Sequence, residues 1–208
     1  MKYFLVLVCM AAMLVGCGKK QNSDDNQNKL IMNMKGKTLT INLDEKLNPA
    51  KTYIADIKTN LGTIQVELYN SQTPKTVKNF VLLSKAGFYN GLTFHRVIDK
   101  FMIQGGDPAG NGGGGASIYG EKFEDEIIPS LTFEEPGVLA MANSGANTNN
   151  SQFFITVAPQ NRLNGGYTIF GKVINGFDIA VAISKVKKDA KDKPIFPVII
   201  DSITISEK

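Results

Sequence analysis

Residues 94–107 read FHRVIDKFMIQGGD, a stretch in which apolar side chains surround a few polar ones. The density of apolar residues predicts that most of the segment is buried in the fold. Arg96 and Gln104 lie within it, and burying either side chain is costly unless it finds hydrogen-bonding partners. One interpretation is a pair of structural polar groups on two strands. The other, which we favour, is a site where an apolar wall and a few fixed donors face a ligand.

Residues 139–155 read LAMANSGANTNNSQFFI and carry a second unusual pattern. Asparagine, serine, threonine and glutamine alternate with small residues, and two adjacent aromatic residues, Phe153 and Phe154, follow them. A solvated loop has little use for the aromatic pair, and a core strand would not carry so many amides. The two stretches together predict a groove with an apolar lining and amide side chains along its rim.

Three blocks of the sequence resemble the signatures of one known family, the cyclophilin peptidyl-prolyl isomerases. They are FHRVIDKFMIQGGD, MANSGANTNNSQFF and YTIFGKVINGFD, which occupy residues 94–107, 141–154 and 167–178 in the family's order. The resemblance extends from Tyr53 to the C-terminus. It implies a mainly β fold, in which an eight-stranded antiparallel barrel has a helix over each end, and it implies cis–trans isomerisation of X–Pro bonds.

The resemblance also implies a role for individual residues. Arg96 matches the family's catalytic arginine, which donates a hydrogen bond to the amide nitrogen as the X–Pro bond twists. Four apolar residues match the pocket for the proline ring, three amides match hydrogen-bonding partners of the substrate backbone, and Ala142 lies beside them. Tyr167 stands where the family often has histidine. The implied substrate-binding residues are Phe101, Met102, Gln104, Ala142, Asn143, Gln152, Phe154, Leu163 and Tyr167.

Prolyl isomerisation needs no nucleophile, metal or cofactor, because its barrier is the partial double bond of the amide. No cofactor and no metal are therefore expected. His95 is the only histidine, and we assign it a structural role because neighbouring side chains on a strand point to opposite faces. The acidic residues within 121–135 are interpreted as a solvated surface, with a metal site or acid–base chemistry as the alternative.

Arg162 departs from the resemblance, because the family often has tryptophan at this position. Its flat, charged side chain at the groove edge favours acidic or extended substrates. The substitution also motivates a second hypothesis, a proline-peptide binding module or chaperone in which catalysis is weak or irrelevant. Turnover of an Ala-Pro peptide distinguishes the two hypotheses.

The order of the predicted elements favours a closed antiparallel barrel. Residues 53–69 contain two alternating runs that predict a hairpin. Thr73 and Pro74 begin a predicted helix that Gly87 ends, and residues 177–184 form a second one. Many short strands without a βαβ rhythm are typical of such a barrel.

The first 52 residues divide into parts that precede an isomerase domain at 53–208. Residues 1–17 resemble a bacterial lipoprotein signal peptide, since a basic start and a short apolar run lead to Cys17, the implied lipidation site. An ordinary secretory signal is the alternative. Residues 18–52 are then a tether and an N-terminal extension, in which the alternation at 38–43 predicts either a packed strand or an ordered linker.

This N-terminus predicts a lipid-anchored protein of the bacterial cell envelope, in the periplasm or on the outer face of a membrane, that assists the folding of exported proteins. A formal net charge of +4 over 208 residues is too modest to indicate a nucleic-acid-binding protein. The expected partners are therefore proline-containing polypeptides and a membrane. Nothing in the sequence requires more than a monomer.

Overall fold

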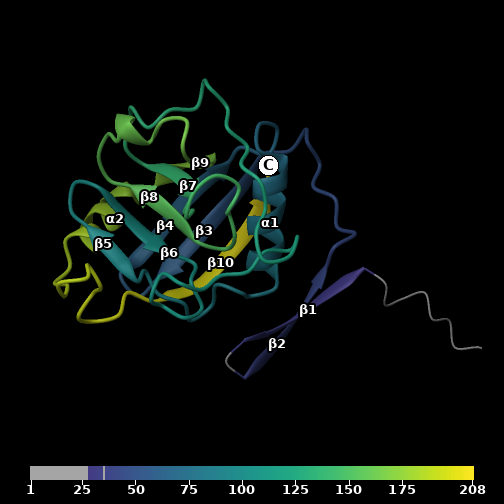
Figure 1. Cartoon of the computed structure of the whole chain (residues 1–208), viewed down its shortest axis with the longest axis horizontal. Coiled ribbons are helices and arrows are strands. Elements are labelled where there is room, and N and C mark those ends of the chain that lie inside the picture. Colours follow the sequence, from purple (N-terminus) through teal and green to yellow (C-terminus); the bar gives the residue numbers. More distant parts are fainter. Residues whose placement is uncertain (1–27, 35) are drawn as a thin grey trace, which may run out of the picture.

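The main body of the protein is an eight-stranded antiparallel sheet that curls strongly on itself (Figure 1). The computed structural model describes residues 28–34 and 36–208, so the predicted signal peptide, Cys17 and most of the polar tether lie outside the described residues. The strands of the large sheet are β3 (Tyr53–Thr59), β4 (Gly62–Leu68), β5 (Arg96–Ile98), β6 (Met102–Gly105), β7 (Val138–Met141), β8 (Phe153–Thr156), β9 (Ile169–Asn175) and β10 (Ile200–Glu207).

The sheet is open, which corrects the expected closed barrel. Its strand order is β10-β3-β4-β9-β7-β8-β6-β5, so β10 and β5 are edges. Strand β5 has only three residues and does not pair with β10. The chain just before β5 meets the start of β10 instead: Phe94 N–H donates to Val198 O at 2.9 Å, and Ile200 N–H donates to Leu92 O at 2.8 Å. The outer edge of β5 is covered by a loop instead, where Val97 N–H donates to Asp192 O at 2.9 Å.

The two faces of the sheet bury different sets of side chains. The inward face contributes Val97, Ile103 and Phe153 to a large core, all of them fully buried. The outward face carries a second, smaller apolar cluster that includes Met102 and Phe154. Because successive strand residues alternate between faces, the run of apolar residues in the first signature block serves both clusters. The functional groups described below lie on the outward face.

Two α-helices pack on the sheet where the sequence predicted them, and Figure 1 shows them on opposite sides of it. Helix α1 (Pro74–Lys85) contacts β10, and α2 (Phe177–Ser184) contacts β4, β5 and β6. The predicted hairpin is formed by β3 and β4, which pair in register from Tyr53 opposite Leu68. Among the described residues, no helix combines the length and the apolar character needed to cross a membrane.

The N-terminal extension is a hairpin of its own, built from β1 (Lys29–Met34) and β2 (Lys37–Asn42) and lying beyond α1 in Figure 1. Ile41 is only 2% exposed and joins the main core. Lys78 Nζ, on α1, donates to Leu43 O at 2.9 Å, which holds the chain after the hairpin against the helix. Of the two alternatives for this segment, the structure therefore shows a packed strand, with a partner strand that the sequence analysis did not predict.

Candidate active site

A row of register partners crosses four neighbouring strands and sets the frame of the site. Arg96 on β5 lies opposite Gln104 on β6, Gln104 lies opposite Phe154 on β8, and Phe154 lies opposite Ala140 on β7. Cross-strand partners point to the same face of a sheet. Residues that are far apart in the chain therefore present an arginine, an amide and an aromatic ring side by side on the outward face.

A cavity of about 100 Å³ opens over this row. Its floor is apolar, and the ring of Phe154 stands perpendicular to that of Tyr167 with their centroids 5.5 Å apart. Nine of the ten residues that the sequence analysis selected line this one cavity. They are Arg96, Phe101, Met102, Gln104, Ala142, Asn143, Phe154, Leu163 and Tyr167.

The tenth residue, Gln152, lies behind the cavity lining and is 6% exposed. Its Oε1 accepts a hydrogen bond from Gln104 Nε2 at 2.9 Å, and its own Nε2 donates to Gly112 O at 3.0 Å and to Gly114 O at 2.6 Å. Its amide is thus bonded at both ends within the protein. Gln152 connects Gln104 to the glycine-rich loop, residues 106–120, a role for that loop that the sequence pattern did not indicate.

The rim of the cavity is held by backbone and amide hydrogen bonds. Ala142 N–H donates to Gln152 O at 3.0 Å, and Asn143 Nδ2 donates to Gly166 O at 2.9 Å. The second bond links the asparagine-rich loop, residues 142–152, to the segment between Leu163 and Tyr167. The side-chain amide of Asn143 is therefore hydrogen-bonded within the protein, and the residue still lines the rim of the cavity.

Two groups approach the Arg96 guanidinium from different sides. Gln104 Oε1 lies 3.5 Å from Nη1, on the cavity side, and Asp192 Oδ2 lies 3.9 Å from Nε. Asp192 also accepts a hydrogen bond from Lys188 Nζ at 2.7 Å. Its backbone has φ = +64°, a conformation that few residues other than glycine adopt. Asp192 could not be predicted from the sequence, since positions 96 and 192 are distant in the chain and no motif joins them.

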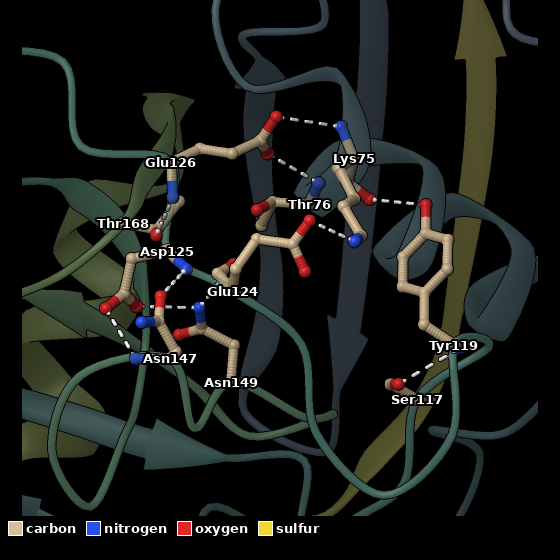
Figure 2. A network of polar contacts seen from close by, with 10 residues as sticks. All are labelled: Lys75, Thr76, Ser117, Tyr119, Glu124, Asp125, Glu126, Asn147, Asn149 and Thr168. Carbon is tan, nitrogen blue, oxygen red and sulfur yellow. Dashed lines mark hydrogen bonds and ion pairs between the residues drawn. The ribbon is translucent and has the colours of Figure 1, made fainter.

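The acidic segment has structural partners (Figure 2). The Glu126 carboxylate accepts hydrogen bonds from Lys75 N–H at 3.1 Å and Thr76 N–H at 2.8 Å, at the first turn of α1. Thr73 begins the helix at the N-cap position, as predicted, but its side chain makes no capping bond and donates to Tyr69 O instead. Glu126 therefore replaces Thr73 as the group that satisfies the helix start.

The neighbouring carboxylates join the same network. Glu124 pairs with the ammonium group of Lys75, while Asp125 accepts hydrogen bonds from Asn147 N–H at 2.7 Å and from Asn149 Nδ2 at 2.8 Å. In the part of the chain that the structure describes, no group of three or more His, Cys, Asp or Glu side chains is placed to hold a metal ion. The segment ties α1 to the asparagine-rich loop at the rim of the site.

Arg162 and His95 do not line the cavity, but each directly precedes a residue that does, Leu163 and Arg96. The guanidinium of Arg162 lies over the ring of Phe101, 4.8 Å from its centroid, as a cation–π contact. His95 is 5% exposed. Burial lowers its pKa, and the nearby charges of Lys193 and Arg96 act in the same direction, although Asp107 opposes them. The imidazole is therefore neutral at neutral pH.

The chain is similar to named peptidyl-prolyl isomerases. It is 51% identical over 143 residues to the peptidyl-prolyl cis-trans isomerase ppi1 of Schizosaccharomyces pombe, covering 69% of this chain and 92% of that protein. It is 52% identical over 139 residues to the human peptidyl-prolyl cis-trans isomerase-like 1, a match that covers 67% of this chain and 84% of the human protein. A crystal structure of a cyclophilin type isomerase from Cryptosporidium parvum matches with a TM-score of 0.74 and 46% identity, covering 76% of this chain and 99% of that one.

These relatives contradict the expected location in a bacterial cell envelope. Similar proteins at 51–52% identity come from fission yeast, mouse and human, and none of these three is described as an envelope lipoprotein. The expectation came from a short local pattern in residues 1–17, a single apolar run that ends near Cys17. That pattern lies outside residues 54–205, the range to which the family match described next is confined.

The family itself agrees with the three signature blocks. Residues 54–205 match the family described as "Cyclophilin type peptidyl-prolyl cis-trans isomerase/CLD". This range contains the whole cavity, the row from Arg96 to Ala140 and both helices. The predicted activity is thereby confirmed, and the chain belongs to the cyclophilin-type peptidyl-prolyl cis-trans isomerases.

Proposed function

We propose that Arg96 is the catalytic group of this isomerase and that the apolar cavity beside it receives the proline ring of the substrate. The barrier to isomerisation is roughly 18–20 kcal/mol and arises from the conjugation of the amide nitrogen with the carbonyl. When the bond twists, the nitrogen regains its lone pair and becomes a better hydrogen-bond acceptor. A donor held beside the nitrogen binds the twisted amide more tightly than either planar isomer and so lowers the barrier.

The single observation that carries this proposal is that Arg96 shares one cavity with the apolar side chains. Its side chain is 44% exposed, so the guanidinium can meet a ligand while Gln104 and Asp192 restrain it. Met102 and Phe154 are almost fully buried beneath the same cavity and form its fixed floor. A proline ring on that floor leaves its amide within reach of the arginine.

The remaining lining residues are proposed to orient the substrate. Gln104 and the rim at Ala142 and Asn143 offer donors and acceptors to an extended backbone, and Leu163 and Tyr167 close the far side of the ring pocket. We assign Gln152 to positioning Gln104, because Gln152 is 6% exposed and, unlike Gln104, does not line the cavity. This differs from the direct contact with substrate that the resemblance implied.

Proline-containing polypeptides are the proposed substrates, and the chain is proposed to act as a monomer. The Cryptosporidium parvum relative, at 46% identity, has a crystal structure in the presence of the dipeptide Ala-Pro. The nine lining residues already supply the arginine, the apolar floor and the amide rim of the site. Exported clients are not part of the proposal, because they depended on the location that the relatives contradict.

The test is cis-to-trans isomerisation of an Ala-Pro peptide by wild type, Arg96→Ala and Arg96→Lys. Arg96→Ala should lower kcat/KM by about 10²–10³-fold, the range measured when one preorganised donor is removed. Arg96→Lys should restore little, since an ammonium lacks the planar fork of the guanidinium. Unfolding transitions should coincide for the three proteins. Equal turnover by wild type and Arg96→Ala would remove Arg96 from the mechanism, and a folded wild type without turnover would favour a binding module.

A further inference from the structure

A second and larger cavity, of about 350 Å³, lies beside Arg96. It shares Arg96 with the proposed proline site, so the two cavities are neighbours on either side of that residue. The polar residues that line it include His95, Asp189, Lys191 and Lys193. It lies between the glycine-rich loop and the loop that covers β5.

The charge of this cavity is predominantly positive. Arg96, Lys191 and Lys193 line it together with one carboxylate, Asp189, while Asp192, which is not part of the lining, pairs with Arg96. The Oδ1 of Asp189 accepts hydrogen bonds from the backbone N–H groups of Lys191 and Lys193 at 2.8 and 2.9 Å, and these bonds hold its pKa below the usual value. Asp189 thus braces the turn that carries the two lysines. Among the described residues, neither lysine takes part in an ion pair.

His95 supplies the second, independent observation. Only 5% of its surface is exposed, yet within the described residues neither Nδ1 nor Nε2 has a hydrogen-bond partner. Buried polar atoms without partners are rare in folded proteins and call for an explanation. Gly112, which lines the cavity, lies next to Nε2: an added Cβ at this glycine would be 3.9 Å from that nitrogen, at ordinary contact distance. A neutral imidazole has one N–H donor, and here that donor is left without a partner.

We propose that this cavity binds an anionic side chain, a carboxylate or a phosphate, of the same polypeptide whose proline occupies the neighbouring cavity. Lys191, Lys193 and Arg96 supply the positive charge and His95 supplies a buried donor. An extended chain advances about 3.3 Å per residue. Because the cavities adjoin at Arg96, the anionic residue lies within about three positions of the proline. This inference rests on the proposed function and defines its substrate class.

The test compares matched proline peptides that carry one Glu, phosphoserine or Gln at each of the three positions before and the three positions after the proline. Isomerisation by the full chain is followed by NMR exchange. At one or more positions kcat/KM should be about five-fold higher for Glu than for Gln, the order expected for an ion pair near the surface. The preference should fall with added salt. A phosphoserine preference without a Glu preference would identify phosphate as the recognised group.

Lys191→Gln/Lys193→Gln is the informative variant, because both side chains are exposed and neither belongs to the proposed proline site. It should retain wild-type kcat/KM on the Gln peptides and lose the preference for the anionic ones. Lys58→Gln/Lys172→Gln removes the same charge from β3 and β9, outside this cavity, and should keep the preference. Equal kcat/KM for Glu, phosphoserine and Gln at all six positions, or a preference that survives in Lys191→Gln/Lys193→Gln, would overturn the proposal.

A binding readout separates this inference from the proposed function. His95 is the only histidine, so its ring signals in an NMR spectrum of the untagged protein are unique. These signals should shift when one or more of the Glu or phosphoserine peptides are added, and should not shift when the matching Gln peptides are added. If the protein turned over no peptide at all, the proposed function would fail, while the His95 shift would still support or refute the anion site.

Discussion

Arg96 and Gln104 face each other directly across β5 and β6, with Gln104 Oε1 3.5 Å from Arg96 Nη1. Gln104 is itself held by Gln152, which is anchored to the carbonyl oxygens of Gly112 and Gly114. The guanidinium is therefore restrained through a chain of two amides that ends in the backbone of the glycine-rich loop. Preorganisation of this kind makes a donor effective, because no reorganisation is needed as the amide twists.

Gln104→Leu should lower kcat/KM by about ten-fold, in line with about 1–1.5 kcal/mol for a lost hydrogen bond and an unpaired buried partner. Both the restraint on Arg96 and the donor to Gln152 disappear in this variant. Gln65→Leu is the matched control, since Gln65 is also a strand glutamine and bonds Asp56 at 2.8 Å away from the cavity lining. Peptide turnover measures both. An unchanged kcat/KM for Gln104→Leu would show that Arg96 needs no such restraint.

Asp192→Asn should lower kcat by about two- to five-fold with little change in KM, because the carboxylate restrains Arg96 and does not line the proline cavity. Asparagine tolerates the left-handed backbone at this position, where φ is +64°, so the loop should keep its shape. Asp201→Asn, an exposed change on β10, serves as the control. A rise in KM alone would instead assign Asp192 to substrate binding.

Glu126→Ala should destabilise the protein by about 1–2 kcal/mol, as the loss of a helix cap does. Two backbone N–H groups at the start of α1 would lose their acceptor, as Figure 2 makes clear. Urea denaturation measures the change. Glu124→Ala removes a carboxylate from the same segment but breaks only an exposed ion pair, so its midpoint should remain close to that of wild type. Equal losses in the two variants would contradict the capping role.

The stability of the protein should fall as the pH drops below about 6.5, the ordinary pKa of histidine. Burial lowers the pKa of His95 in the folded state, with Lys193 and Arg96 contributing and Asp107 opposing. The unfolded chain then binds a proton at a pH where the folded protein does not. The stabilisation is therefore complete above the unfolded pKa and is lost as the pH falls through the folded one.

His95→Gln should weaken the dependence of stability on pH in this range. The variant contains no histidine, so no other imidazole obscures the result. Asp107 does not titrate in the same window. Although its burial opposes ionisation, the N–H groups of Asn111, Ala109 and Gly112 outweigh that effect and lower its pKa. Urea denaturation of both proteins at a series of pH values tests the prediction. If the free energy of unfolding fell equally steeply in wild type and His95→Gln as the pH dropped below 6.5, the prediction would be refuted.

Much of the site could be predicted because its residues lie in long, irregular blocks. Phe101, Met102 and Gln104 come from the first block and Asn143 and Phe154 from the second, and the structure brings them to one cavity. Gln152, from the second block, was predicted to contact the substrate. Its position behind Gln104 depends instead on its hydrogen bonds to Gly112 and Gly114 in the glycine-rich loop. Asp192 was missed for a related reason, since its approach to Arg96 follows from the path of a loop rather than from a motif.

The sequence by itself determined the family, the two helices and the strands that alternate, because these depend on periodicity and on residues close together in the chain. Only the tertiary structure decided that the sheet stays open between β10 and β5 and that Glu126 caps α1 from 50 residues away. It also decided that Lys191 and Lys193 adjoin Arg96 in one cavity. Such contacts join distant segments, and they exist only after the sheet has curled and its loops have closed over the edges.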